Sequence, residues 1–137
     1  MMFDVECIGK DGQKRVYKFK YIEEDRHRVY LLNNEEIIQR EILDFQLISL
    51  DDMLKISDMY IQDINYREKG IPEGIIINLS KLLNKTIASS TRFQGNNEHL
   101  HEPAKKVWDR LVMNGFAYYD EDAGRYKTLK KEVLWNF

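Results

Sequence analysis

Hydrophobic and polar residues alternate along the first half of the chain, which is the pattern of half-buried β-strands. These runs are separated by polar turn residues and cover residues 3–8, 16–21, 28–32, 42–50 and 56–64. The strongest turn signals are Gly-Lys-Asp-Gly at residues 9–12 and the pair Asp51 and Asp52. Residues 33–40 do not alternate clearly and are compatible with a short helix opened by Asn34. The pattern therefore predicts an antiparallel meander.

The apolar spacing changes to that of amphipathic helices after residue 70. Pro72 and Pro103 each stand where a helix would begin, a position that tolerates proline because its N–H has no intrahelical partner there. Helices are therefore predicted over residues 72–84 and 103–115, and Gly115 ends the second one. The other elements of this half are a short strand, a polar loop and a hairpin, over residues 86–90, 91–101 and 116–129.

Together these elements predict an α/β fold, more closely an α+β mixed sheet, in which the meander is followed by a β-α-β-α-β-hairpin segment. Residues 57–64 and 86–90 are expected to pair in parallel around the first helix, because a right-handed crossover joins them naturally. The chain has 137 residues, 43% of them hydrophobic, which suits one core. No repeat or linker interrupts it, so we expect a single domain over residues 1–137.

The net charge is only −2, but it is unevenly distributed. Residues 1–65 hold 14 acidic and 9 basic side chains, residues 66–110 hold 5 and 8, and residues 111–137 hold 4 of each. A net positive middle third suits a small ligand that carries phosphate. It does not suit DNA, which calls for a strong basic stripe.

The single cysteine, Cys7, excludes an internal disulfide and favours a reducing compartment. The chain starts without the features of a signal peptide, and no apolar run approaches the roughly 20 residues of a membrane span. We therefore expect a cytoplasmic protein without a membrane partner.

The order of elements from residue 56 to residue 129 resembles that of GNAT-type N-acetyltransferases, and a short phage and bacterial branch in particular. The cofactor loop of this family reads Arg or Gln, two residues, Gly, one residue, then Gly or Ala. Residues 67–72, Arg-Glu-Lys-Gly-Ile-Pro, fit five of these six positions. The pair Ser89 and Ser90 and the helical segment 104–115 also resemble this branch.

The resemblance implies that acetyl-CoA is the cosubstrate and that its pyrophosphate binds at residues 67–74. Backbone N–H groups of such a loop and of the following helix N-terminus attract anions. Gly70 would allow close backbone approach, and Arg67 and Lys69 add positive charge. The expected cofactor-binding residues are Arg67, Glu68, Lys69, Gly70, Ile71, Pro72, Gly74, Ser89 and Ser90.

Acetyl transfer to an amine requires a base for the ammonium group and an acid for the leaving thiolate. The base candidates, in order, are Asp63, Glu41 and Asp44, and each is otherwise a solvated carboxylate. The acid candidates are Tyr118 and Tyr119, which are otherwise packing residues.

Direct attack of the amine is expected, because Cys7 is far in sequence from the loop and no Ser-His-acid arrangement is evident. The acceptor would be a small or peptidic amine that no motif identifies, and oligomer formation is left open.

Two other functions fit the same residues. Pro72 removes one N–H donor and the usual helices after the first strand are absent, which leaves open a catalytically inactive GNAT-like binding or assembly module. A winged-helix nucleic-acid-binding protein would use residues 103–115 for recognition, but the acidic tip at residues 120–122 would repel phosphate. Glu98, His99, His101 and Glu102 lack the spacing of a metal motif and are interpreted as a solvated loop.

Overall fold

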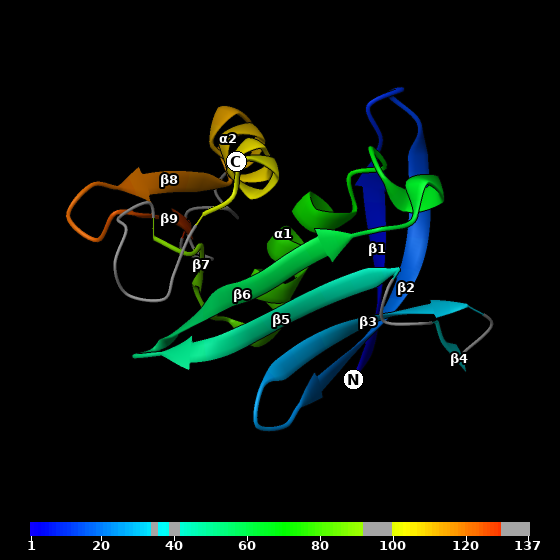
Figure 1. The fold of residues 1–137 in the computed structure, drawn as a ribbon, viewed down its shortest axis with the longest axis horizontal. Coiled ribbons are helices and arrows are strands. Elements are labelled where there is room, and N and C mark those ends of the chain that lie inside the picture. Colours follow the sequence, from blue (N-terminus) through cyan, green and yellow to red (C-terminus); the bar gives the residue numbers. More distant parts are fainter. Residues whose placement is uncertain (34–35, 39–41, 92–99, 130–137) are drawn as a thin grey trace.

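A computed structural model describes residues 1–33, 36–38, 42–91 and 100–129. Within these ranges the chain forms one mixed sheet of nine strands, which are β1 (Met2–Ile8), β2 (Lys14–Glu23), β3 (His27–Asn33), β4 (Glu36–Ile37), β5 (Leu43–Leu50), β6 (Met53–Ile61), β7 (Ile87–Ala88), β8 (Ala117–Asp120) and β9 (Arg125–Thr128). The helical elements are η1 (Ile64–Tyr66), α1 (Ile71–Leu83) and α2 (Glu102–Met113). The strand order is β1-β2-β3-β5-β6-β7-β9-β8, and β4 pairs with β3 (Figure 1).

The antiparallel meander predicted for the first half is confirmed from β1 to β6. Alternation along β1 buries Phe3, Val5 and Cys7 and exposes the residues between them, as a half-buried strand requires. The prediction for residues 33–40 differs, because residues 36–37 form strand β4 rather than helix. Asn34 itself lies outside the described residues.

The position of the last meander strand also differs from the prediction of residues 56–64. Strand β6 begins at Met53, because the tight turn at residues 51–52 lets Leu50 pair with Met53 immediately. It ends at Ile61, and Ile64 already belongs to the 3-10 turn η1. Asp63 caps that turn by accepting a hydrogen bond from the N–H of Asn65, which accounts for the early end of the strand.

The predicted parallel pair around α1 exists, but it is short and lies earlier along β6 than expected. Leu54 pairs with Ile87 and Lys55 with Ala88, whereas residues 57–61 of β6 do not pair with β7. Ser57 is an extra residue in the β5–β6 register, since Ile56 faces Leu47 and the next pair joins Asp58 to Gln46. Such a β-bulge bends a strand and increases its twist, so β6 diverges from β7.

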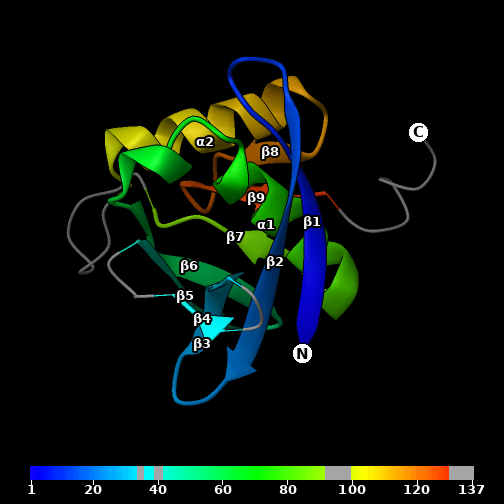
Figure 2. The same ribbon diagram turned by 90° about the vertical axis from the view of Figure 1, so that its right-hand side faces the viewer.

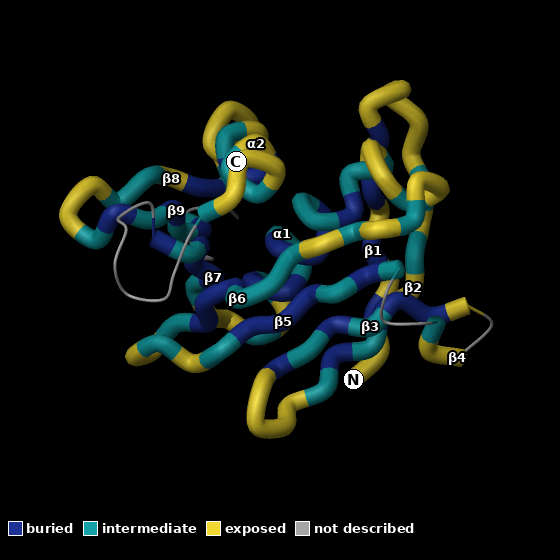
Figure 3. The backbone as a smooth tube through the Cα atoms, in the orientation of Figure 1, coloured by how far each residue is buried: buried dark blue, intermediate teal, exposed yellow. Residues whose placement is uncertain are grey.

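Helix α1 lies along the inner side of the curled sheet and contacts β1, β7 and β9 (Figure 2). Its buried face carries Ile71, Ile75, Ile76 and Leu79, which join one hydrophobic cluster with residues of both halves of the chain. Figure 3 shows this buried interior between the exposed turns. Both helices begin one residue before the proline that the sequence marks, so Pro72 and Pro103 occupy their second positions.

The C-terminal segment packs α2 on the β8–β9 hairpin. Trp108 of α2 is fully buried and stacks on Tyr126 of β9, with ring centroids 6.0 Å apart. The hairpin joins the large sheet through the pairing of Ala88 in β7 with Lys127 in β9, so it is no free-standing winged helix. Neither helix of the described residues is long and apolar enough to span a membrane.

Candidate functional site

The candidate site is the loop of residues 67–70, which connects η1 to α1 beyond the end of β6. Arg67 is fixed over the last residue of β6, because its Nε donates to the carbonyl oxygen of Ile61 at 3.0 Å. Its backbone N–H donates to the carbonyl oxygen of Ile64, which closes the 3-10 turn. The loop therefore begins from a well-defined position on the sheet, with an exposed guanidinium group.

Two residues of this loop adopt left-handed backbone conformations, Glu68 with φ of 58° and Gly70 with φ of 77°. A Cβ atom on Gly70 would overlap the carbonyl oxygen of Ile8 in β1. Gly70 therefore approaches β1 closely, and not the pyrophosphate that the sequence suggested. Packing against β1 alone accounts for this glycine. Gly74 is explained similarly, since its Cβ would lie 2.7 Å from Val5 Cγ1 and 2.8 Å from Cys7 Sγ.

The first turn of α1 presents backbone donors. The N–H groups of Gly70, Ile71 and Glu73 donate to no described residue, and no side chain caps the helix. Pro72, in the second position, has no N–H to offer. Unsatisfied N–H groups and the positive end of the helix dipole favour an anion here, and Arg67 and Lys69 add positive charge.

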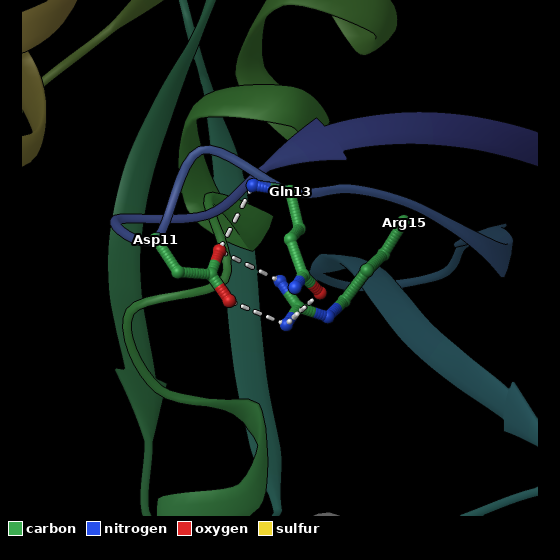
Figure 4. Close-up of polar contacts among 3 residues, drawn as sticks. All are labelled: Asp11, Gln13 and Arg15. Carbon is green, nitrogen blue, oxygen red and sulfur yellow. Dashed lines mark hydrogen bonds and ion pairs between the residues drawn. The ribbon is translucent and has the colours of Figure 1, made fainter.

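The β1–β2 turn also holds the candidate loop in place, through contacts of Lys10 with Glu68. The N–H of Lys10 donates to the carbonyl oxygen of Glu68 at 2.8 Å, and the Lys10 ammonium lies 3.6 Å from the Glu68 carboxylate. This turn is itself tied by Asp11, which accepts hydrogen bonds from Arg15 at 2.7 and 3.2 Å and from the Gln13 N–H at 3.0 Å (Figure 4).

These bonds change the acidity of Asp11. The Arg15 guanidinium, with the Gln13 N–H, lowers the pKa of Asp11 to about 2, and the charge of Lys69 contributes to the same direction. The hydrogen bond from Lys10 to Glu68 makes this turn and the candidate loop close neighbours.

The second part of the site is the edge of β6 beyond its short pairing with β7. Ser90 Oγ donates to the carbonyl oxygen of Ile56 at 3.1 Å, and the Arg67 side chain reaches the carbonyl oxygen of Ile61. Between these two contacts, the β6 backbone of residues 57–60 makes no hydrogen bond toward β7 or to any other described residue on that side. Within the part of the chain that the structure describes, polar backbone groups of β6 therefore have no ladder partner on that side.

The two serines assigned to the cofactor have structural partners. Ser89 is buried, accepts a hydrogen bond from the Tyr126 N–H at 2.9 Å and donates to the Ser90 carbonyl oxygen at 2.7 Å. It thereby extends the pairing of β7 with β9. Ser90 bridges the diverging strands β6 and β7 and lies at one end of the open β6 edge.

The candidate catalytic residues are spread over the molecule. Asp63 lies just beyond β6 and caps η1, with Oδ1 2.8 Å from the Asn65 nitrogen. Asp44 lies opposite Tyr60 on β5, on the face away from the core, and accepts a hydrogen bond from Gln46 at 2.7 Å. Glu41, Glu98 and His99 lie outside the described residues.

The two tyrosines lie on β8, at the far edge of the sheet, and β7 and β9 separate them from β6. Tyr118 is exposed, and Tyr119 packs edge-on against Tyr126 with ring centroids 4.9 Å apart. The structure therefore brings Asp63 next to the candidate loop and leaves both tyrosines on a different part of the sheet.

Cys7 lies in β1 beneath the start of α1, much nearer to the loop than its sequence position suggests. It is buried, and this burial raises the pKa of its thiol to about 12, with a smaller contribution from the Glu73 carboxylate. At neutral pH it is therefore a protonated packing residue rather than a thiolate nucleophile.

Three features of the site lack a sequence signal. The bulge at Ser57, the support of residue 68 by Lys10 and the ion pair between Glu73 and Arg110 all join residues that are distant in sequence or have no distinctive local pattern. Comparisons of the chain with protein families, with curated proteins and with solved structures found no match.

Proposed function

We propose that this protein binds acetyl-CoA between the open edge of β6 and the start of α1, and transfers the acetyl group to an amine by direct attack. The observation that carries the proposal is that two features follow one another along the chain. Among the described residues, the β6 backbone has no pairing partner on the β7 side at residues 57–60, and the chain then leads through Arg67 to N–H groups of α1 that donate to no described residue.

Each feature suits a different part of the cosubstrate. An anionic pyrophosphate is stabilised by helix N-terminal N–H groups and by the charges of Arg67 and Lys69. An extended amide-containing arm is complementary to an open strand edge, because it can replace the missing ladder hydrogen bonds. The same edge offers backbone N–H groups that could stabilise the oxyanion of a thioester under attack.

The proposal is supported by the sequential order from β6 onward, which is strand, helix, strand, helix and hairpin, since the GNAT resemblance was drawn from that order. Direct attack is supported by the state of Cys7, which is buried and protonated at neutral pH. Asp63 is the described carboxylate closest along the chain to the end of β6, so it remains our first choice of base.

The proposed contact of Arg67 with the pyrophosphate can be tested by calorimetry, which measures the affinity for coenzyme A. Arg67→Ala should weaken binding by about tenfold, since a charge-assisted hydrogen bond contributes roughly 1.5–3 kcal/mol. Arg28→Ala is the matched control, because Arg28 lies on β3 next to Gln46, on the face away from α1, and should bind as the wild type does. Unchanged affinity in Arg67→Ala would contradict the placement.

A binding module without catalysis is the second candidate, and one observation favours it. Asp63 and Asp44 each accept a local hydrogen bond, from Asn65 and Gln46, so both carboxylates have structural partners. Incubation with acetyl-CoA and a panel of small and peptidic amines separates the two functions. Turnover that falls in Asp63→Asn while coenzyme A affinity persists supports the enzyme, whereas tight binding without turnover on any amine supports the module.

A further inference from the structure

Arg110 of α2 connects the two helices at the point where α1 begins. Its Nε donates to Oε1 of Glu73 at 2.9 Å, and its Nη2 contacts the same oxygen. Glu73 is the third residue of α1, and its side chain is only 17% exposed, whereas that of Arg110 is 56% exposed. The arginine therefore neutralises a largely covered carboxylate, and it does so across 37 residues of sequence.

This carboxylate stands at the helix end that would otherwise attract an anion. Glu73 is favourable for α1 itself, since a negative charge in the first turn complements the helix dipole. For a bound diphosphate, however, the same charge is repulsive, because it lies in the turn that supplies the N–H donors. A cation paired with Glu73 removes this conflict.

We infer that Arg110 is a positioning residue for the anionic part of the ligand: it makes the α1 N-terminus competent to bind a diphosphate by neutralising Glu73 rather than by touching the ligand. The inference rests on the proposed binding of coenzyme A. It adds an explanation of how the proposed site can bind a diphosphate although it contains the carboxylate of Glu73. It also gives α2 a role in ligand affinity although α2 supplies no residue of the loop.

A double-mutant cycle tests the inference, with the dissociation constant of coenzyme A measured by calorimetry. Arg110→Gln should weaken binding about fivefold to tenfold, because Glu73 is then left unpaired beside the phosphates. Glu73→Gln should strengthen binding about fivefold. The double variant should return to within about twofold of the wild type, since the repulsive charge and its partner are both gone.

A matched control lies on the same helix. Lys105 pairs with Asp109 at 2.7 Å, one turn apart on α2, so Lys105→Gln removes an equal charge from a comparable ion pair. It should leave the coenzyme A affinity within about twofold of the wild type. Raising the salt concentration should reduce the difference between Arg110→Gln and wild type, which a purely structural role of Arg110 would not do.

The outcomes are distinguishable from a failure of the proposed function. If wild-type protein binds no coenzyme A, both proposals are overturned. If wild type binds and Arg110→Gln is unchanged, or if the double variant is as weak as Arg110→Gln, the neutralising role is overturned and the coenzyme A site stands. Thermal melting of each variant, followed by circular dichroism, verifies that the fold is intact.

Discussion

The antiparallel meander and the C-terminal segment are built on different kinds of contact. Strands β1, β2, β3, β5 and β6 are each 7 to 10 residues long, and the ladders of β1 with β2, β2 with β3 and β5 with β6 run along most of their length. In the C-terminal segment, β7 has only two residues, and side chains complete its pairing: Thr128 accepts from the Ile87 N–H, and Ser89 from the Tyr126 N–H.

This difference explains why the candidate site lies at the boundary between the two regions. A strand that is paired by only two residues can diverge from its neighbour, so no described residue pairs with the β7 side of β6 beyond Lys55. Side-chain hydrogen bonds then hold the diverging part in place without closing the sheet. The regular region supplies a strand that is paired along its length with β5, and the irregular region pairs with only a short part of its other side.

The largest effect is expected where α2 is joined to the hairpin. Trp108→Ala should lower the free energy of unfolding by about 4 kcal/mol, since it leaves a large cavity beside Tyr126. Met113→Ala, at an exposed position of the same helix, should change it by less than about 0.5 kcal/mol. Denaturant unfolding measures both, and a separate early transition of the C-terminal segment would contradict the single shared core.

Replacing Gly70 tests how the candidate loop depends on its contact with β1 of the meander. Gly70→Ala should destabilise the protein by about 3 kcal/mol, because the new Cβ meets the backbone of Ile8 and the left-handed conformation is strained. Gly12→Ala is the matched control, with φ of 80° and no atom near its Cβ, and should lose only about 1 kcal/mol. Equal losses would show that contact with β1 is not what requires this glycine.

The hydrogen bond between the Thr128 side chain and β7 can be removed by a substitution that hardly changes the shape of the side chain. Thr128→Val deletes the buried acceptor of the Ile87 N–H and should cost about 2 kcal/mol in thermal or denaturant unfolding. Thr86→Val, at a partly exposed position just before β7, should be within about 0.5 kcal/mol of the wild type. A smaller loss in Thr128→Val than in this control would argue against side-chain pairing as the main support of β7.

The smallest expected effect concerns the turn that supports the loop. Because Arg15 holds the pKa of Asp11 at about 2, below its unfolded value near 4, the carboxylate favours the folded state above about pH 4 and loses this contribution as the pH falls toward 2. NMR titration of the Asp11 carboxyl carbon should show this midpoint in wild type and an upward shift in Arg15→Gln. An identical midpoint in both proteins would exclude the ion pair as its cause.

Local patterns predicted most of the elements correctly. Alternation identified β1, β2 and β3, and the two prolines marked both helices, because burial of one face and proline chemistry act within a few residues. The general α/β character and the parallel connection around α1 followed from the order of these elements.

What the sequence did not predict depends on contacts between distant residues. The place where β6 meets β7 is set by the bulge at Ser57 and by Ser90, neither of which has a periodic signal. Gly70 looked like a ligand-binding glycine, yet its partner is Ile8 on β1. The pairing of Glu73 with Arg110 likewise requires the packing of α1 against α2, which periodicity within each helix does not show.

The most direct test of the central claim is an NMR titration of isotope-labelled protein with coenzyme A. Binding between the β6 edge and the start of α1 predicts saturable amide shifts at Gly70, Ile71 and Glu73 and over residues 57–60, with few changes along β1–β3 outside the 9–15 turn. Absence of any shift, or shifts confined to β8 and β9, would contradict the account.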